Sequence, residues 1–264
     1  SYAVREYDGT VRMRLDAALV KRGLAESRSE ASRLIDAGHV TVSGAFADKS
    51  SRMVAHHEPI AVVVEKKFVS RGGEKLSHAL DSFGIDVTNR SVMDAGVSTG
   101  GFTDCVLQRG ARRVFAVDVG RNQLHERIKA DAKVDWRDGV NVREISRDDM
   151  PFDCSLLVAD LSFISLTKVL PALMGVMSSE DAYPSAHMVL LVKPQFEAGR
   201  VEVSRGKGVI TDPEIHAAAT QTVQECVETL GGVVLGLIES PIKGAEGNTE
   251  FLMFVECRTS SVGC

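Results

Sequence analysis

The sequence has little cysteine and no long hydrophobic run. Its five cysteines are odd in number, irregularly spaced and without a Cys-x-x-Cys pair, which argues against a disulfide framework or a zinc site and fits a reducing cytoplasm. The best candidate for a membrane span, Leu156 to Met177, is interrupted by Asp160 and Lys168, so we expect no membrane span. We also expect no signal peptide at the start of the sequence.

Charge is unevenly distributed along the sequence. The net charge is −5, which by itself argues against a nucleic-acid partner. Residues 12–52, however, hold eight Lys or Arg and five Asp or Glu, a net charge of +3, so the remaining residues carry −8. A small basic module joined to an acidic body is a pattern expected of an RNA binder with a catalytic partner. The alternative is a chance fluctuation of surface charge.

Residues 11–64 are predicted to form a small α+β domain after a disordered tail, residues 1–10. A chain of 264 residues has room for a medium domain beside such a small one. A first helix is expected to end at Gly23. Ser27 and Glu30 form a capping box that opens a second helix, which stops at Gly38. Strands are predicted at residues 40–42 and 60–64.

Basic, apolar and glycine residues recur in this domain in a specific order. They are Arg14, Leu15, Asp16, Gly23, Leu24, Ser27, Arg28, Ala31, Leu34, Ile35, Gly38, Val40, Val42, Gly44 and Lys49. The pattern resembles the alpha-L RNA-binding motif of a small-subunit ribosomal protein and of pseudouridine synthases. It implies phosphate contacts, which supply affinity and position. The RNA-binding residues we expect are Arg14, Lys21, Arg22, Arg28, Arg33 and Lys49, joined by Lys66, Lys67 and Arg71 of a basic linker at 65–72.

Residues 73–264 alternate between strand-like and helix-like segments. Such alternation predicts the α/β class, a Rossmann-like fold with a parallel sheet covered on both faces by helices. Strands are predicted at residues 91–93, 114–117, 155–159, 188–192, 233–238 and 251–255, and helices at 74–83, 103–109 and 213–230. The last helix begins with Asp212 as its cap and Pro213 at its first position.

A glycine-rich turn, DAGVSTGG at residues 94–101, follows the first of these strands. Such a turn lets the backbone approach a ligand, and the next helix offers it free N–H groups. Position 98 is Ser rather than the Gly of the dinucleotide fingerprint, and Asp94 stands where an acid can hold the ammonium group of S-adenosyl-L-methionine. Asp118 ends the following strand, where a carboxylate accepts bonds from ribose hydroxyls. The predicted cofactor-binding residues are Asp94, Gly96, Ser98, Gly100, Gly101, Phe102, Asp118 and Asp160, with Asp138 or Asn141 at the adenine edge.

The same turn also satisfies the Gly-x-Ser-x-Gly pattern of hydrolases at residues 96–100. A hydrolase would need a later acid and then His187 or His216 as its base. Asp94 and Asp118 would have no task in that scheme, so we prefer the cofactor interpretation.

Four further polar residues stand at the edges of apolar segments: Lys75, Asp160, Lys193 and Glu250. They lie within the segments SRGGEKL at 70–76, ADLSFIS at 159–165, LVKPQFE at 191–197 and GNTE at 247–250, and the glycine turn belongs to a fifth segment, DAGVSTGGFT at 94–103. From residue 12 onward the chain resembles the TlyA family, hemolysin A-like proteins that are ribosomal RNA 2′-O-methyltransferases. Only Val97, where the family often has Ala or Pro, departs from the pattern. The resemblance implies an FtsJ-type catalytic domain at 73–264 with a Lys-Asp-Lys-Glu catalytic tetrad on these four residues.

The implied reaction is S-adenosyl-L-methionine-dependent 2′-O-methylation of ribosomal RNA, with cytidine as the expected nucleoside. A ribose hydroxyl must lose or share its proton as it attacks the methyl group. Lys193 would approach that hydroxyl, Asp160 would hold Lys193, and Glu250 would pair with Lys75. Desolvation and a nearby cation would make Lys193 a base, whereas dominant carboxylates would keep it protonated as an orienter, and the sequence leaves both open.

Several alternatives remain at this point. The four residues could form two ordinary salt bridges near a sheet edge. The family's older name suggests a membrane-active hemolysin, and a non-catalytic RNA-binding or ribosome-assembly factor is the third possibility. For the preferred enzyme we expect no metal, no membrane partner, a monomer in the cytoplasm, and ribosomal RNA or ribosomal subunits as partners.

Overall fold

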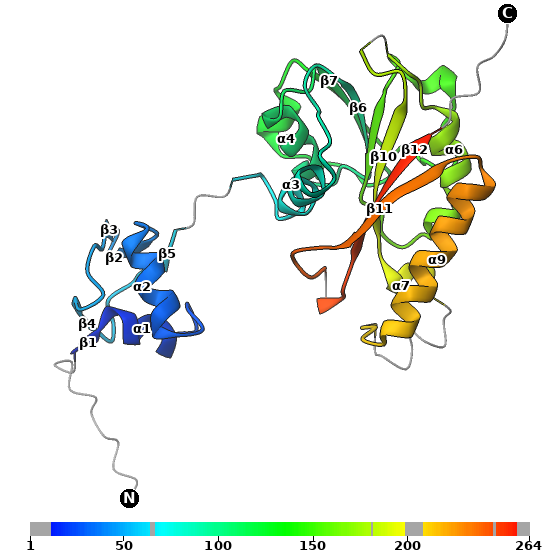
Figure 1. Cartoon of the computed structure of the whole chain (residues 1–264). Coiled ribbons are helices and arrows are strands. Elements are labelled where there is room, and N and C mark those ends of the chain that lie inside the picture. The colour runs from blue at the N-terminus through cyan, green and yellow to red at the C-terminus, as the bar shows by residue number, and fades with distance from the viewer. Residues whose placement is uncertain (1–11, 64–66, 181, 199–207, 245–246, 258–264) are drawn as a thin grey trace, which may run out of the picture. The chain divides into compact units, whose positions relative to one another are not determined.

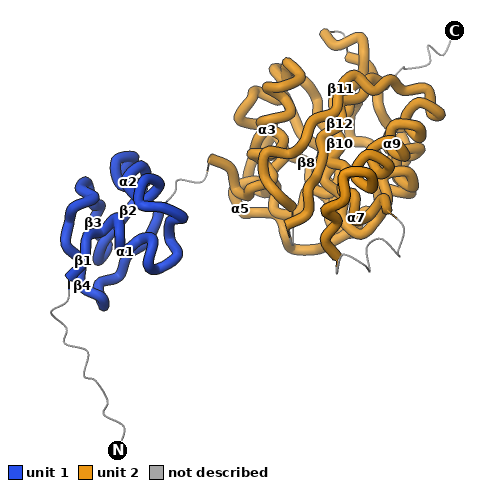
Figure 2. Tube along the Cα trace, turned by 60° about the horizontal axis from the view of Figure 1, so that its bottom comes forward, with its two compact units in different colours: residues 1–66 blue, residues 67–264 orange. Residues whose placement is uncertain are grey.

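The computed structural model describes residues 12–63, 67–180, 182–198, 208–244 and 247–257, and it divides the chain into two compact units. Unit 1 is Ser1–Lys66 and unit 2 is Lys67–Cys264 (Figure 2). Most of the predicted linker, from residue 67 onward, thus belongs to unit 2. The predicted tail and Lys66 lie outside the described residues. No described helix is both long enough and apolar enough to span a membrane.

Unit 1 contains two helices and two small antiparallel sheets. The helices are α1 (Leu15–Lys21) and α2 (Arg28–Asp36). One sheet pairs β1 (Arg12–Arg14) with β4 (Met53–Ala55), and the other places β2 (Val40–Val42) between β3 (Ala45–Phe46) and β5 (Ile60–Val62). Apolar side chains from both helices and from β2 and β4 form a common core.

The helix signals of unit 1 act largely as the sequence predicts. Ser27 Oγ accepts a hydrogen bond from the backbone N–H of Glu30 at 3.1 Å. The Glu30 carboxylate binds the backbone N–H of Glu26 at 2.6 Å, one residue before the cap, so the capping box is only half as predicted. Helix α1 ends at Lys21, before Gly23, whose φ is +70°. Strands β1, β3 and β4, of two or three residues each, were not predicted.

Unit 2 is built on a seven-stranded sheet in the order β11-β12-β10-β9-β6-β7-β8. The parallel strands are β6 (Ser91–Ala95), β7 (Arg113–Asp118), β8 (Val134–Asp138), β9 (Leu156–Ala159) and β10 (Ala186–Val192). Strand β12 (Phe251–Cys257) runs antiparallel between β10 and β11 (Val233–Glu239). This mostly parallel, Rossmann-like sheet confirms the predicted fold class.

Helices cover both faces of the sheet (Figure 1). One face packs against α3 (Gly72–Phe83), α4 (Gly101–Gln108) and α5 (Glu126–Lys129), and the opposite face packs against α6 (Leu170–Gly175) and α9 (Pro213–Thr229). Shorter helices are η1 (Arg147–Asp149), η2 (Leu166–Lys168) and α7 (Pro194–Glu197). Two apolar cores therefore hold the sheet, one on each face, and its strand ends are left for polar chemistry.

Strand β8 is the one strand of this sheet, as described, that was not predicted. Its sequence, VDWRD, has only two apolar residues, and all five residues remain partly exposed at the edge of the sheet. An edge strand buries too little to need the apolar composition by which the central strands were recognised.

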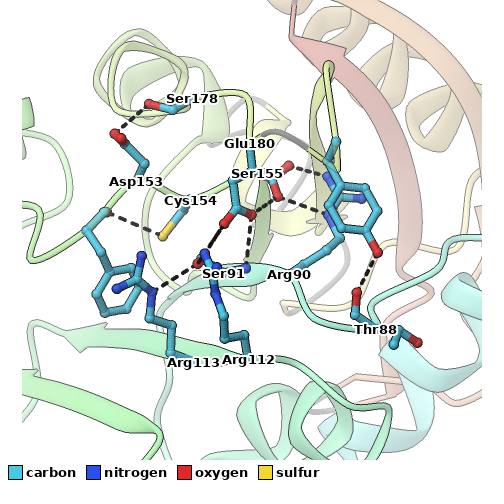
Figure 3. Close-up of polar contacts among 12 residues, drawn as sticks. Thr88, Arg90, Ser91, Arg112, Arg113, Asp153, Cys154, Ser155, Ser178 and Glu180 are labelled. Atoms are coloured by element: carbon cyan, nitrogen blue, oxygen red, sulfur yellow. Dashed lines mark hydrogen bonds and ion pairs between the residues drawn. The ribbon is translucent and has the colours of Figure 1, made fainter.

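A buried polar network closes the sheet at the amino ends of β6, β7 and β9 (Figure 3). The Glu180 carboxylate accepts hydrogen bonds from the backbone N–H of Ser91 at 3.1 Å and from the hydroxyls of Ser91 and Ser155, and it pairs with Arg112. Buried Arg90 donates from Nε to Ser155 Oγ at 3.1 Å. Because buried charges are costly unless they are partnered, we assign this network a structural role in fastening the segment around Glu180 to the sheet.

Candidate active site

The strand order reverses between β6 and β9. From β6 the chain proceeds through β7 to β8 on one side, whereas β9 continues to β10 on the other. In open α/β sheets, ligands bind beyond the carboxyl ends of the strands at such a reversal. The glycine turn follows β6 and Asp160 follows β9, so the sequence places both at this crevice.

Two glycines of the turn are required by its geometry. Gly96 has φ +86°, and a Cβ there would collide with the backbone carbonyl of Asp160. Gly100 has φ +100° as the residue before α4, and a Cβ there would come within 2.9 Å of the Leu124 side chain. The absence of a side chain therefore lets the turn lie against the β9 loop at Gly96 and against Leu124 at Gly100.

Two cavities meet at this turn. The larger, about 560 Å³, is lined by Gly96, Ser98, Asp118, Val119, Gly120, Gln123, Val140, Asn141, Val142, Asp160, Leu161, Ser162, Phe163 and Ile164. The smaller, about 220 Å³, is lined by Ser70, Arg71, Gly72, Lys75, Gly96, Val97, Ser98, Thr99, Gly101, Phe102, Asp160 and Gly244. Gly96, Ser98 and Asp160 line both, so the cavities adjoin at the turn.

The larger cavity has the composition that a nucleoside-bearing cofactor requires. Its volume falls in the usual range for small-molecule sites. Val119, Val142, Leu161 and Ile164 supply apolar surface for a base, and Asp118 supplies a carboxylate for ribose hydroxyls. Val119 is 73% exposed, which is unusual for a valine and fits a surface that a ligand covers.

Backbone amides hold the Asp118 carboxylate in place. Its Oδ2 accepts from the N–H of Ser98 and its Oδ1 from the N–H of Gly120, both at 2.7 Å. Asp138 instead accepts from the N–H of Asn122 at 2.8 Å and lines neither cavity in the described structure. Of the two residues predicted for the adenine edge, Asn141 is therefore the one at the cavity, and Asp138 shapes the neighbouring loop.

Asp94 lies beneath the turn. Its side chain is fully buried, and Oδ2 accepts from Thr103 Oγ1 at 2.6 Å. Its Oδ1 has no hydrogen-bond partner among the described residues. Burial raises the pKa of this carboxyl to about 7. Asp94 lines neither cavity as described, so its contact with a cofactor ammonium group stays a prediction.

The four predicted catalytic residues form two ion pairs. Lys75 Nζ lies 2.5 Å from Glu250 Oε2, and Lys193 Nζ lies 2.6 Å from Asp160 Oδ1. Both lysines and Glu250 are buried, so each charge needs its partner. Lys193 and Asp160 follow the parallel strands β10 and β9, and Lys75 is on α3. Glu250 precedes antiparallel β12, which brings the start of that strand to the same edge.

The segment before α3 forms part of the smaller cavity. Phe68 is buried against Gly73, where any Cβ would collide with its ring. Asp104 on α4 accepts from the backbone N–H of Val69 at 2.8 Å and from Arg127 at 2.6 Å. Arg71, predicted to bind RNA, lines this cavity beside Lys75.

Phe163 is a site residue that sequence reasoning missed. It lines the larger cavity, its ring is 91% exposed, and its φ of +65° is rare for a bulky residue. Its ring centroid lies 5.3 Å from that of Phe196, which follows Lys193 by three residues. An aromatic residue in the polar loop directly after the Asp160 strand was the available signal. Ser70, Thr99, Val119, Gly120, Gln123, Leu161, Ser162, Ile164 and Gly244 were also missed.

The hydrolase alternative finds no support in the geometry. Ser98 Oγ donates to Gln123 Oε1 at 3.3 Å. His187 stacks on Phe254 at the far end of β10, and His216 contacts the carbonyl of Ile210. Among the described residues, neither histidine contacts Ser98, so the serine lacks a base.

The predicted RNA-binding residues of unit 1 divide into three groups. Lys21, Arg33 and Lys49 are exposed and form no ion pair with a described residue. Asp16 holds Arg14 at 3.0 Å and Arg28 at 2.9 Å. Arg22 forms the third group, with contacts inside unit 1 that were not predicted. Its guanidinium group donates to the carbonyls of Ala55, His56 and Glu58, so it links α1 to the loop after β4.

The fold and the site together define a methyltransferase with a Rossmann-like catalytic domain. The family model of FtsJ-like methyltransferases matches residues 68–257, and that of the S4 domain matches residues 13–60. The chain therefore belongs to the FtsJ-like methyltransferase family and carries an S4 domain before its catalytic domain.

Individual relatives agree with this assignment and confirm the predicted resemblance to the TlyA family. The chain is 42% identical to the 16S/23S rRNA (cytidine-2′-O)-methyltransferase TlyA of Mycobacterium tuberculosis, over 94% of this chain and 91% of the relative. It is 39% identical to Hemolysin A of Brachyspira hyodysenteriae, over 91% and 98%. A solved structure of a Streptococcus thermophilus protein described as a hemolysin is 39% identical, with a TM-score of 0.71 over 94% of this chain and 90% of that one.

Proposed function

We propose that this protein transfers a methyl group from S-adenosyl-L-methionine to the 2′-hydroxyl of a cytidine ribose in ribosomal RNA. The observation that carries the proposal is the meeting of two lysine–carboxylate pairs at one edge of the sheet, beside the two cavities. The identity to TlyA of M. tuberculosis supports the substrate and the nucleoside.

The larger cavity is the proposed cofactor site. Asp118 would accept from the ribose hydroxyls of the cofactor, and Val119, Asn141 and Val142 would surround its adenine. The Gly96 turn would receive its amino-acid end, with Asp94 below. When bound there, S-adenosyl-L-methionine supplies an electrophilic methyl group.

Lys193 is proposed to address the ribose 2′-oxygen. Its nitrogen forms an ion pair with the Asp160 carboxylate at 2.6 Å. We therefore infer that Lys193 acts as an ammonium group that orients the hydroxyl and stabilises the negative charge developing on its oxygen. Lys75, held by Glu250, would supply a second cation at the smaller cavity. The hydroxyl proton leaves to solvent in this scheme.

Phe163 supports a nucleotide substrate. An exposed aromatic ring at the wall of the cavity can stack on a base that has left its helix. Its neighbour Phe196 and the nearby Lys193 would keep such a base close to the reacting ribose.

The S4 domain is proposed to deliver the RNA. Its exposed Lys21, Arg33 and Lys49 can contact phosphates. Arg14 and Arg28, in the same domain, form ion pairs with Asp16. Phosphate contacts give affinity without reading sequence, so the choice of nucleotide would rest with the catalytic domain.

Tritium transfer tests the proposal. Purified ribosomal subunits are incubated with the protein and methyl-labelled S-adenosyl-L-methionine, and the RNA is digested to nucleosides. We expect label in 2′-O-methylcytidine, and loss of transfer by about 100-fold or more in Lys193→Ala with cofactor Kd changed less than about threefold. Label in a base-methylated nucleoside, or none on either subunit, would contradict the proposal. Lys133→Ala, an exposed lysine just before β8, is the control.

A further inference from the structure

Lys193 has a second oxygen partner besides Asp160. Its Nζ lies 2.6 Å from Asp160 Oδ1 and donates to Ser162 Oγ at 2.9 Å. Both partners are on the loop that follows β9, whereas Lys193 is at the end of β10. The ring centroid of Phe196 lies 5.9 Å from the same nitrogen, within the range of a cation–π contact. The lysine nitrogen is thus held from several directions.

We propose that Ser162 is a positioning residue for methyl transfer. Together with Asp160 it fixes the amino group of Lys193, so that the one remaining tetrahedral position of the nitrogen faces the ribose 2′-oxygen. This inference rests on the proposed function and extends it to a residue outside the Lys-Asp-Lys-Glu tetrad.

The geometric argument depends on the number of anchors. A lysine side chain has four rotatable bonds, and a single partner leaves its nitrogen free to swing around that partner. Two partners on different residues define both the place of the nitrogen and the direction of its third N–H group. In a neutral amine with the same two bonds, the lone pair would occupy that third direction. Ser162 therefore aims Lys193 in either protonation state.

The position of Ser162 supports a role at the reacting group. Lys193 is only 8% exposed, whereas Ser162 is exposed and, like Asp160, lines the larger cavity. The Ser162 hydroxyl accepts from Lys193, and its own hydrogen binds no described residue. The contact therefore lies at the wall of the larger cavity, beside the proposed cofactor site.

The second lysine of the site is held differently. Lys75 pairs with Glu250 at 2.5 Å and has no hydroxyl partner among the described residues. Gly244 lies directly beside the same carboxylate, because a Cβ at this position would collide with Glu250 Oε1. Among the described residues, Lys193 thus has two oxygen partners and Lys75 has one. This difference is expected if Lys193 alone contacts the reacting oxygen.

The test compares Ser162→Ala and Ser162→Thr with the wild type and with Ser165→Ala. Ser165 belongs to the same loop, but its hydroxyl donates to Glu197 at 2.6 Å. Ser165→Ala therefore removes a serine hydroxyl from this loop without removing a contact to Lys193. The measurements are kcat and KM for ribosomal subunits, cofactor Kd, and the dependence of kcat on pH between about 6 and 10.

We expect Ser162→Ala to lower kcat by about 10-fold to 100-fold, the scale of a small misplacement of a reacting group. Cofactor Kd should change less than about twofold, because the hydroxyl contact is to Lys193. The pH profile of kcat should differ from that of wild type, because the Lys193 nitrogen has lost one of its two oxygen partners. Ser162→Thr, which keeps the hydroxyl, should recover most of kcat, and Ser165→Ala should keep the wild-type pH profile.

Wild-type kcat and pH profile in Ser162→Ala would overturn the inference, and so would a Thr variant as slow as the Ala variant. A second readout does not depend on activity. In ¹⁵N-labelled protein, the Lys193 ammonium signal should exchange slowly with water and should broaden in Ser162→Ala but not in Ser165→Ala. If wild type methylates no RNA, the proposed function fails, and this signal still decides whether Ser162 holds Lys193.

Discussion

Thr103 holds one oxygen of the Asp94 carboxyl and leaves the other without a partner. Thr103 Oγ1 donates to Oδ2 at 2.6 Å, and Oδ1 meets no donor among the described residues. Burial raises the pKa of Asp94 to about 7, so its proton is easily gained or lost near neutral pH.

The first prediction concerns stability. The folded pKa of Asp94, about 7, is above its ordinary value of 3.8, so the folded state holds the extra proton between those limits. Its contribution to stability is therefore greatest at low pH and declines as pH rises from about 4 to about 7. We expect Asp94→Asn to remove this decline. Calorimetric melting of wild type and variant at pH 5 and pH 8 checks it, and an identical change of Tm in both proteins would contradict it.

The second prediction concerns cofactor binding. An ammonium group near Asp94 would favour its charged form, so binding at pH 6.5 should release part of a proton. Isothermal titration in two buffers of different ionisation enthalpy measures this release directly. Asp94→Asn should show no such buffer dependence. Equal binding enthalpies for wild type in the two buffers would place the ammonium group away from Asp94.

The third prediction concerns the close approach of the glycine turn to the β9 loop. In Gly96→Ala the new Cβ meets the carbonyl of Asp160 and the side chain of Leu161, on a backbone with φ +86°. We expect cofactor affinity to fall at least about 10-fold and unfolding free energy to drop by about 1–3 kcal/mol. Gly175→Ala, where a Cβ meets nothing within 4 Å, is the matched control. Cofactor affinity as in wild type would show that the turn adjusts.

The fourth prediction concerns Phe163. Its ring is exposed and touches few parts of the core, so Phe163→Ala should leave Tm within about 2 °C while weakening use of RNA. Loss of base stacking corresponds to about 1–3 kcal/mol, or about 5-fold to 150-fold in kcat/KM for ribosomal subunits. Phe163→Tyr should retain most activity. Equal kcat/KM for the Ala variant and wild type would remove Phe163 from the substrate site.

The fifth prediction separates RNA contacts from structural arginines in unit 1. Arg33 is exposed and forms no ion pair with a described residue. Arg33→Gln should therefore lower the slope of log K against log salt concentration by about one, the value for one phosphate contact. The stability of the unit should not change. Arg22 donates to three backbone carbonyls, so Arg22→Gln should instead destabilise the unit. Melting curves and RNA titrations at several salt concentrations distinguish the two. An unchanged Tm in Arg22→Gln would contradict the structural role.

The sequence predicts the central strands well because they are buried on both faces and are therefore continuously apolar. It fails for β8, where a partly exposed edge allows charged residues such as Asp135 and Arg137. The tetrad residues could be named because the resemblance to the TlyA family implies them, and each also adjoins a strand or helix signal. Phe163 was missed although it stands in the loop directly after the Asp160 strand, because its unusual φ and its exposure at a cavity are visible only in the folded chain.

The same limit explains why the contacts of two polar residues could not be predicted. In the sequence, Arg22 cannot be distinguished from other basic residues at the end of a helix. Its hydrogen bonds to carbonyl groups at and after the end of β4 are seen only in the folded chain. Ser162 is one of many serines, and only the packing of the β9 loop against β10 brings its hydroxyl to Lys193. Contacts between segments distant in sequence leave no local pattern to read.

The single reversed strand of the sheet has a consequence for biosynthesis. Glu250 enters the site from the start of β12, 175 residues after its partner Lys75. Strands β6 to β10 and the glycine turn precede β12 in the chain. Until Glu250 has been synthesised, the ammonium group of Lys75 lacks its carboxylate partner. The growing chain is therefore a methyltransferase without a complete active site. The tetrad is complete only after residue 250 has been synthesised and β12 has paired with β10.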